Sequence, residues 1–334
     1  MKIPKAVLNL SLFLFAAFVS LLAFEGSLAV FGFPKEAPES IAYPPNFYDE
    51  TDFFGSPYVV KANSLGIRYP EIPLKKNGAG EIRVAVIGDS FTEGLGVKEN
   101  QRFSSIMENR WSKPSRRVYF INCGVSGAGP REYLRIFYHI ALRYHPDKLL
   151  VVLYANDLSD SRESLEYQRS GIKQWIHAVF PRVYARLKVF HYKLLVHKFR
   201  VFEEVLGSKA PISEPTSLRE VSGTIRERSW HFMSNALSQI VRECRNKKIR
   251  VAVAYIPSYA RQDAGDLELR LMQWSQKERI AFLNLAPYFE EAARRDPKPY
   301  YFREDIHWNT HGHALAASIL SDWLKNIAWP GEID

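Results

Sequence analysis

Ser90 is the residue in this chain best placed to act as a nucleophile. It lies in the run GDSFTEG, residues 88–94, which overlaps the end of the apolar run IRVAVIG, residues 82–88. A serine at a strand-to-helix turn exposes its hydroxyl, and nearby backbone N–H groups can face a developing oxyanion. The run is not a G-x-S-x-G elbow, and no G-K-[ST] follows that would make it a phosphate-binding loop. The pattern therefore indicates acyl-transfer chemistry at Ser90.

A histidine near the end of the chain could serve as the base for this serine. His307 lies in the run EDIHWN, residues 304–309, just before the last helical pattern. An imidazole can accept a serine proton while a neighbouring carboxylate fixes its tautomer and steadies the imidazolium. His307 is therefore the candidate general base, and the two acidic residues before it are candidates for the orienting carboxylate.

The elements around these residues predict an α/β fold. Short apolar runs indicate strands over residues 82–88, 118–122, 148–154, 250–255 and 281–285. Amphipathic patterns predict helices over residues 102–111, 130–144 and 310–325. Such alternation favours a three-layer α/β/α, flavodoxin-like sandwich whose central, mostly parallel sheet has about five strands. The carboxyl ends of the strands then meet at one edge, which gathers Ser90, Gly127, Asn156 and His307.

Four sequence blocks in this order resemble the SGNH/GDSL hydrolase family. Its first block is the Gly-Asp-Ser at Ser90, and its second is a glycine after the second strand, best matched by Gly127, with Gly124 as the lesser candidate. Its third is Asn-Asp, matched at Asn156. The resemblance implies that the Ser90 N–H, the Gly127 N–H and the Asn156 amide form an oxyanion hole. It extends from Asn63 to Trp323 and includes the run NSLGIR, residues 63–68.

The last block departs from the commonest family pattern, which places the acid three residues before the histidine. That position is Glu304 here, and Asp305 lies two residues before His307. The Asp-x-His-Trp-Asn form looks like that of membrane-anchored bacterial relatives and of polysaccharide O-acetyltransferases. We therefore expect a triad of Ser90, His307 and Asp305, with Glu304 as the alternative acid.

A metal site is the competing interpretation of the histidines near the C-terminus. His307, His311 and His313 lie close to Asp305 in sequence. However, Asn309 or Thr310 has the character of a helix N-cap, which would place His307 before the helix. A serine triad needs no metal, so we expect neither a metal nor another cofactor.

The N-terminus predicts a membrane segment. Lys2 and Lys5 precede an uncharged apolar run from Ala6 to Phe24, which ends at Glu25. Nineteen helical residues extend about 28 Å, close to the thickness of a bilayer core, and the positive flank predicts that the rest of the chain is exported. The run Ser-Leu-Ala at residues 27–29 also resembles a signal-peptide cleavage site. We favour an uncleaved anchor with a periplasmic or cell-surface catalytic domain; cleavage would make the protein secreted.

The remaining chain divides into three expected parts. Residues 1–33 form the anchor or signal segment, residues 34–80 an extended linker that packs on the domain, and residues 81–334 the catalytic domain. A helical, aromatic and basic insertion is expected at about 160–215. It could contact a membrane surface, line an anionic substrate groove or form a solvated amphipathic helix.

Composition excludes several classes of function. The 334 residues are 46% hydrophobic, enough for a large core, and carry a formal charge of +9. Zinc-finger spacing, a basic region with heptads and an RNP-like aromatic pair are all missing from the sequence, so a nucleic-acid partner is not expected. The two cysteines, Cys123 and Cys244, form no C-x-x-C pair and are expected to be buried apolar residues.

Three functions remain open at this stage. The first is a serine esterase that releases an acyl group from an O-acylated carbohydrate or lipid outside the cytoplasm. The second is an O-acetyltransferase of a cell-surface polysaccharide, which differs from the first in the acceptor of the acyl group, or a deacetylase of such a polysaccharide. The third is a non-catalytic envelope scaffold, which would predict loss of at least one site residue.

Overall fold

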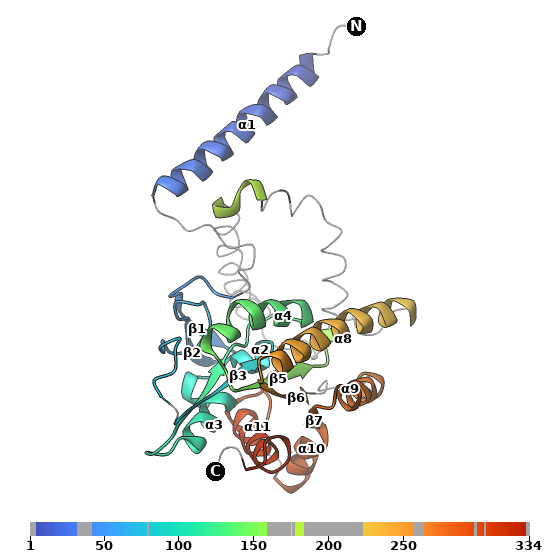
Figure 1. Cartoon of the computed structure of the whole chain (residues 1–334). Coiled ribbons are helices and arrows are strands. Elements are labelled where there is room, and N and C mark those ends of the chain that lie inside the picture. Colours follow the sequence, from blue (N-terminus) through green and yellow to red (C-terminus); the bar gives the residue numbers. More distant parts are fainter. Residues whose placement is uncertain are drawn as a thin grey trace. The chain divides into compact units, whose positions relative to one another are not determined.

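The computed structural model of the chain describes residues 5–31, 42–78, 80–158, 175, 178–183, 223–256, 264–296, 299–303 and 305–331. The chain divides into two compact units. The small unit comprises Met1–Ser40 and Gln168–Gly207, and the large unit comprises Ile41–Tyr167 and Ser208–Asp334. The large unit contains the sheet and its covering helices (Figure 1).

A five-stranded parallel sheet forms the centre of the large unit, which confirms the predicted fold. Its strands are β3 (Glu81–Ile87), β4 (Arg117–Asn122), β5 (Lys148–Tyr154), β6 (Arg250–Ile256) and β7 (Ala281–Asn284). They are ordered β4-β3-β5-β6-β7, and each adjacent pair is parallel. Strand β5 is buried along its whole length, as expected for a sheet covered on both faces. Because β3 lies between β4 and β5, the residues that follow these three strands meet at one edge.

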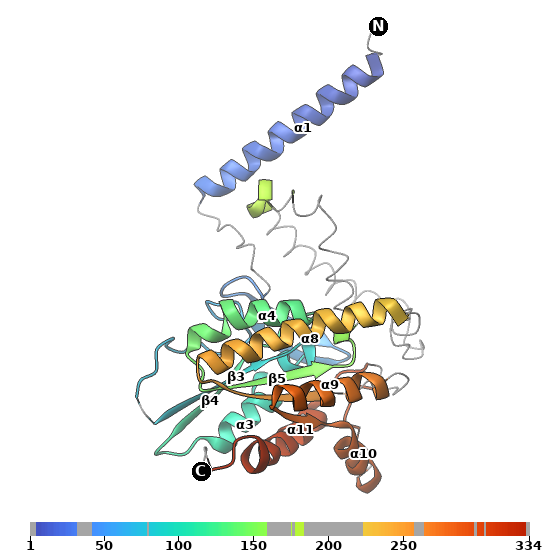
Figure 2. The same cartoon turned by 45° about the vertical axis from the view of Figure 1, so that its right-hand side comes forward.

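Helices cover both faces of this sheet. They are α2 (Ser90–Glu93), α3 (Phe103–Trp111), α4 (Pro130–His139), α8 (Gly223–Asn246), α9 (Ala264–Glu278), α10 (Ala286–Arg295) and α11 (Thr310–Trp323). Helices α4 and α8 pack together on one face, whereas α3 and α11 pack together on the other (Figures 1 and 2). The Trp111 indole N–H donates to Ser321 Oγ at 3.0 Å and so joins α3 to α11. The layers confirm the three-layer prediction.

Two features of the large unit differ from the sequence-based expectations. The helix expected over residues 130–144 ends at His139, and a 3₁₀ turn, Ala141–Tyr144, follows it. The segment expected to be extended, residues 34–80, contains an antiparallel hairpin of β1 (Tyr48–Phe53) and β2 (Ser56–Lys61). Strand β1 has the polar sequence YDETDF and has no buried residue, which explains why hydrophobic periodicity did not reveal it.

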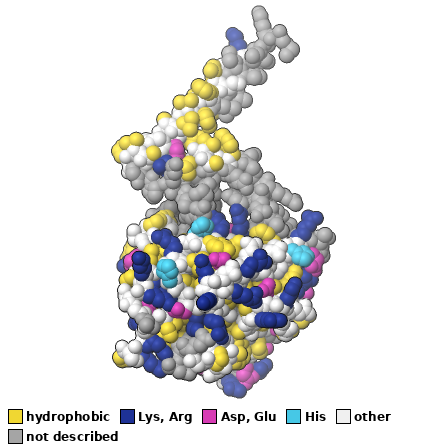
Figure 3. Space-filling view, in the orientation of Figure 1, with side chains coloured by type: hydrophobic (Ala, Val, Ile, Leu, Met, Phe, Trp, Pro, Cys, Tyr) yellow, Lys and Arg dark blue, Asp and Glu magenta, His cyan; other side chains and the backbone are white. Residues whose placement is uncertain are grey.

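The small unit is built on one long apolar helix, α1 (Lys5–Val30). Its segment Ser11–Val30 is long and apolar enough to cross a membrane, a property that secretory signal sequences share. Figure 3 shows hydrophobic side chains over the described part of this helix, whereas Lys and Arg side chains are scattered over the visible face of the large unit. Most of the predicted insertion at 160–215 lies outside the described residues.

Both cysteines are buried, and they do not form a disulfide with each other. Cys123 follows β4 and Cys244 lies in α8, each with no exposed surface. Burial raises the pKa of the Cys123 thiol above its ordinary value and that of Cys244 to about 12. Both thiols therefore remain protonated and unreactive at neutral pH.

Candidate functional site

Ser90 is the first residue of α2 and directly follows the loop that leaves β3. Asp89 is the N-cap of this helix, and its Oδ1 accepts the Phe91 N–H at 3.0 Å. The Ser90 N–H has no acceptor within its own helix, because the first N–H groups of a helix lack an intrahelical partner. Gly88 makes the turn possible, since a Cβ there would lie 2.1 Å from the Thr92 hydroxyl. The serine is thus held at a tight strand-to-helix turn.

His307 lies within hydrogen-bond distance of this serine. The Ser90 Oγ is 2.7 Å from His307 Nε2. On the other side of the ring, His307 Nδ1 contacts Asp305 Oδ1, which also accepts the His307 backbone N–H at 2.8 Å. The carboxylate thus favours a proton on Nδ1 and leaves the Nε2 lone pair directed at the serine hydroxyl. The aromatic rings of Phe91 and Phe53 pack around the imidazole, with centroid distances of 4.9 and 5.8 Å.

Of the two candidate acids, Asp305 and Glu304, the structure describes the contacts of Asp305 only. Asp305 makes the contacts expected of the orienting carboxylate, two to His307. Glu304 lies outside the described residues. The assignment of Asp305 to a catalytic triad therefore stays a prediction, supported by these two contacts.

The residues after His307 hold its loop in place. Trp308 is almost fully buried, and its ring stacks on Phe289 with centroids 5.0 Å apart and planes 8° apart. Asn309 is the N-cap of α11, because its Oδ1 accepts the N–H groups of His311 and Gly312 at 2.9 and 3.1 Å. The Asn309 side-chain N–H₂ also donates to two carbonyls of the preceding loop. These contacts of Trp308 and Asn309 therefore hold the loop that carries His307 in place.

The predicted oxyanion residues lie at the ends of the strands that flank β3. Gly127 follows β4 with a φ of +74°, a conformation that favours glycine, and a Cβ there would meet no neighbouring atom. Gly124 has a different role, since its N–H already donates to Asn122 Oδ1 at 2.9 Å and its Cα packs against the backbone of α2. Asn156 lies in the turn after β5 and is half-buried. Gly127 thus stays the preferred candidate of the two glycines, and its place in an oxyanion hole stays a prediction.

The adjacent aspartates of the motifs make structural contacts. Asp157 is buried, and its two oxygens accept the Tyr133 hydroxyl at 2.8 Å and the Tyr154 N–H at 3.0 Å. Asp89 is also buried, and burial raises its pKa to about 6, with a partial offset from the nearby His307 and from the Phe91 N–H. The carboxyl of Asp89 therefore titrates two pH units above an exposed aspartate.

Glu93 is a buried acidic residue beside Ser90 whose contacts sequence reasoning did not identify. It is fully buried at the end of α2, three residues after Ser90. Its Oε2 accepts the Ser126 N–H at 2.7 Å, and its Oε1 accepts the Tyr43 hydroxyl at 2.5 Å. Ser126 directly precedes Gly127, so the Glu93 carboxylate connects the serine helix to the glycine loop. The available signal was the second acidic residue of the run GDSFTEG, which the turn itself does not require.

Arg68 holds the other end of the serine helix. This residue is 1% exposed and donates to the carbonyls of Gly94 and Val97, each at 2.6 Å. Buried Arg102 donates in turn to the Arg68 carbonyl. The run NSLGIR was noted before the first block, but its sequence does not show that the arginine points inward. Arg68 therefore anchors the loop that follows the Ser90 helix.

The histidines beyond His307 do not form a metal site with it. His313 is buried, its Nδ1 faces the Phe103 N–H at 3.4 Å, and its ring stacks on Phe103. Burial lowers the pKa of His313 to about 3, with Arg102 adding to the effect, so this imidazole stays neutral. His311 is exposed. Among the residues that the structure describes, no three His, Cys, Asp or Glu side chains are grouped as metal ligands.

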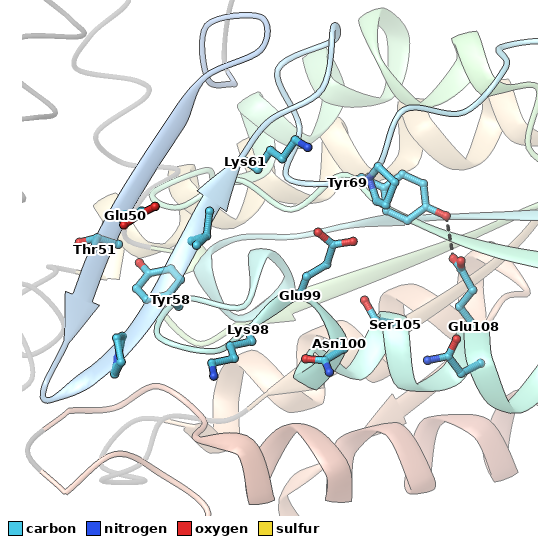
Figure 4. Close-up of a pocket in the computed structure, with 14 residues that line it drawn as sticks. Glu50, Thr51, Tyr58, Lys61, Tyr69, Lys98, Glu99, Asn100, Ser105 and Glu108 are labelled. Carbon is cyan, nitrogen blue, oxygen red and sulfur yellow. Dashed lines mark hydrogen bonds between the residues drawn. The ribbon is translucent and has the colours of Figure 1, made fainter.

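A hollow of about 710 Å³ lies elsewhere on the large unit, between the β1–β2 hairpin and α3 (Figure 4). Tyr58 and Tyr69 contribute to its lining, together with the polar side chains of Lys98 and Glu99. The Tyr69 hydroxyl donates to Glu108 Oε2 at 2.6 Å, the bond drawn in Figure 4. None of the three predicted triad residues lines this hollow, so it is separate from the Ser90–His307 site.

The fold and these blocks define an ester-hydrolysing serine hydrolase of the α/β/α class. The chain belongs to the GDSL-like Lipase/Acylhydrolase family, whose model matches residues 86–315. This match covers more than half of the chain and confirms the resemblance found in the sequence.

Solved structures with a similar arrangement are distant in sequence. A two-domain esterase active on acetylated mannans, crystallised with mannopentaose, is 16% identical, with a TM-score of 0.46 over 76% of this chain and 51% of its own. The chain thus spans about half the length of that protein. The esterase EstA from Pseudoalteromonas sp. is 13% identical (TM-score 0.45, 73% and 97% of the two chains). The acetyl xylan esterase AlAXEase is 12% identical (TM-score 0.44, 73% and 100%). No curated protein matches the chain.

Proposed function

We propose that the protein is a serine esterase that works through an acyl-enzyme on Ser90, with His307 as general base and Asp305 as the orienting acid. The observation that carries this proposal is the continuous chain of contacts from Ser90 Oγ through the imidazole to the Asp305 carboxylate. Nucleophile, base and orienting group in hydrogen-bond sequence are the arrangement that activates a hydroxyl at neutral pH.

The reaction begins with attack of Ser90 Oγ on the ester carbonyl carbon as His307 Nε2 takes the serine proton. The resulting imidazolium is stabilised by Asp305. The proton then passes to the departing alcohol, which leaves an acyl group on Ser90. A water molecule, deprotonated by the same imidazole, attacks this acyl-enzyme, releases the carboxylic acid and returns the proton to Ser90.

Three N–H donors bind the oxyanion in this proposal: the backbone groups of Ser90 and Gly127 and the side-chain amide of Asn156. Their elements are β3, β4 and β5, neighbouring strands whose carboxyl ends meet at one edge. Glu93 is a positioning residue, because it holds the N–H of the residue before Gly127. Each preorganised donor contributes about 3–4 kcal/mol to transition-state stabilisation in comparable enzymes.

The substrate that we propose is an O-acyl group on a carbohydrate or lipid outside the cytoplasm. The apolar N-terminal helix, which is long enough to cross a membrane, supports export of the large unit. The family of acylhydrolases supports ester chemistry.

The proposal is tested with the full-length chain in detergent and two p-nitrophenyl esters, acetate and octanoate. We expect hydrolysis by the wild type and a loss of at least about a thousandfold in Ser90→Ala. Ser105→Ala, a change on α3 outside the predicted triad, is the matched control and should retain activity. Labelling by a fluorophosphonate probe should require Ser90. Unlabelled and inactive wild-type protein would contradict the esterase mechanism and favour the scaffold hypothesis.

A separate measurement decides between hydrolysis and transfer. The acyl-enzyme formed from p-nitrophenyl acetate is offered to water alone and to water with a soluble polysaccharide. Release of acetate at equal rates in both indicates an esterase, whereas acetyl incorporation into the polysaccharide indicates the transferase alternative. Both results require Ser90, so this measurement leaves the triad proposal untouched.

A further inference from the structure

Glu25 is the only charged residue between Ala6 and Val30 of the apolar helix. Despite its position near the end of α1, it is 8% exposed. A carboxylate removed from water within an apolar segment is costly unless charged or N–H partners compensate it. The partners of Glu25 therefore indicate what this part of the helix is built to contact.

The partners of Glu25 come from a distant part of the same small unit, of which the structure describes Trp175 and residues 178–183; we call it segment 175–183. Its two carboxylate oxygens accept the Arg182 backbone N–H at 3.0 and 3.1 Å, and Oε2 accepts the Val183 N–H at 2.9 Å. The Arg182 guanidinium forms an ion pair with Oε1 at 3.3 Å. The carboxylate is thus compensated by one full positive charge and two backbone donors, all provided by two consecutive residues.

Apolar contacts join the same two segments on both sides of Glu25. Phe18 stacks on Trp175 with ring centroids 6.3 Å apart and meets Phe180 edge-on at 5.7 Å. Beyond Glu25, Leu28 forms a buried cluster with Phe180 and Val183. The contact therefore runs from Phe18 to Leu28, ten residues or about 15 Å along the helix. A single incidental contact would not extend over this length.

The described surface of α1 is largely apolar. Large hydrophobic side chains of α1 stay exposed along it, namely Leu12, Phe13, Phe15, Val19, Leu21, Leu22, Phe24, Val30 and Phe31. The indole of Trp175 is 52% exposed beside them. Figure 3 shows patches of hydrophobic side chains along the described part of the helix. An apolar surface of this length, flanked by lysine at the N-terminus, fits a lipid bilayer.

We infer that segment 175–183 is a second membrane-contacting element, docked on a retained α1 at the outer bilayer interface, with Glu25 as the fixed point of the contact. Phe18 lies seven residues, or about 10 Å, below Glu25 along the helix, which places Trp175 at the depth typical of interfacial aromatic side chains. Cleavage after Ala29 would remove Glu25, Phe18 and Leu28 together and leave this segment without its partners. The inference is independent of the role of Ser90.

Retention of α1 is tested with full-length protein that carries different epitope tags at its two ends. After expression in a bacterial host, we expect both tags on one membrane-bound band that resists alkaline carbonate extraction. Appearance of the C-terminal tag on a species shortened by about thirty residues would overturn the inference.

Docking of segment 175–183 is tested by fluorescence of Trp175 in bilayers of brominated phosphatidylcholine. The signal is the difference between wild type and Trp175→Phe, because the other six tryptophans all lie in the large unit: Trp111, Trp230, Trp274, Trp308, Trp323 and Trp329. We expect strong quenching of this difference signal by bromine in the upper acyl chain and little quenching by aqueous iodide. Quenching by iodide and not by bromolipid would contradict a membrane contact.

Variants at Glu25 test whether the fluorescence quenching of Trp175 depends on the Glu25 carboxylate. Glu25→Leu should reduce the bromolipid quenching of Trp175 at least twofold and increase iodide quenching, and Glu25→Gln should give an intermediate result. Ser20→Ala is the matched control, because its hydroxyl bonds only to the Ala16 carbonyl of α1. An unchanged thermal unfolding transition of the large unit checks that each variant still folds. Wild-type quenching in Glu25→Leu would show that the carboxylate does not hold the segment.

Discussion

Ser90 and His307 lie next to each other in the large unit, but different kinds of contact hold the two residues in place. Ser90 follows a buried strand, and its surroundings are held by two buried charged side chains, Glu93 and Arg68, whose contacts link parts of the chain that are distant in sequence. His307 lies on an irregular loop, and its neighbours in sequence hold it: Asp305 two residues before and Trp308 one residue after. The first region depends on long-range polar contacts, and the second on local ones.

The two regions should therefore respond differently to mutations that remove a side-chain contact. Removal of one local contact in the histidine loop leaves the sheet untouched and should act mainly on the position of the imidazole. Removal of a buried carboxylate or guanidinium beside Ser90 leaves its former partners unsatisfied and should disturb several elements at once. Measurements of catalysis and stability on matched variants can separate these two kinds of effect.

The largest effect is expected at the orienting carboxylate. Asp305→Asn should lower kcat by about 10³- to 10⁴-fold with little change in folding, because the amide no longer fixes the Nδ1–H tautomer. Steady-state hydrolysis of p-nitrophenyl acetate measures the loss. Glu304→Gln is the matched control, with an expected change of no more than a few-fold. The reverse pattern would transfer the role to Glu304.

A large loss of stability is expected at the tryptophan of the histidine loop. Trp308→Ala should reduce the free energy of unfolding by about 3–5 kcal/mol, because it removes a buried indole that stacks on Phe289. Urea unfolding followed by circular dichroism measures it. Trp308→Phe keeps an aromatic ring and should lose less than half as much. Equal and small losses in both variants would show that the loop does not depend on this anchor.

An intermediate effect on catalysis is expected at Glu93. Glu93→Gln retains one acceptor oxygen, so it cannot satisfy both Tyr43 and the Ser126 N–H. We expect kcat to fall by about 10- to 100-fold with KM nearly unchanged, the pattern of a contact that matters in the transition state. Tyr43→Phe removes only the bond from the Tyr43 hydroxyl and should have a smaller effect. A change confined to KM would contradict a role in positioning Gly127.

The smallest effect is a pH dependence at Asp89. Its pKa is raised in the folded protein, so the native state binds more protons than the unfolded state between about pH 4 and pH 6. Stability from this group is fully present below pH 4 and is lost as the pH rises through 6. Asp89→Asn keeps the acceptor for the Phe91 N–H and should therefore be more stable than wild type at pH 7.5, on the order of 1 kcal/mol, but not at pH 4. Urea unfolding at the two pH values measures this difference, and a constant difference would contradict it.

Much of the fold could be predicted because its strands are buried on both faces. Strand β5 was predicted with its observed bounds, and β3 and β4 to within one residue at each end. The helix cap at Asn309 was also among the two candidates. Positions at strand ends follow from the order of elements alone, which is why Ser90, Gly127 and Asn156 could be placed on one edge before any coordinates were known.

The remaining contacts are long-range and left no periodic pattern. Glu93 meets Tyr43 across fifty residues, and Arg68 reaches carbonyls nearly thirty residues away. Strand β1 has a polar sequence that resembles a loop, and Glu25 lies 157 residues from Arg182. Buried polar pairs of this kind depend on the tertiary fold, and a single sequence carries no direct signal for them.

The two buried cysteines have a practical consequence for the study of this chain. Because both thiols are inaccessible and protonated, the native protein should react slowly with maleimides, and folding in an oxidising compartment needs no disulfide chemistry. A cysteine placed at exposed Phe13 and another at exposed Tyr138 would then be the only reactive sites. Fluorophores at these sites would report the distance between the small and large units, and its distribution, in a natural bilayer.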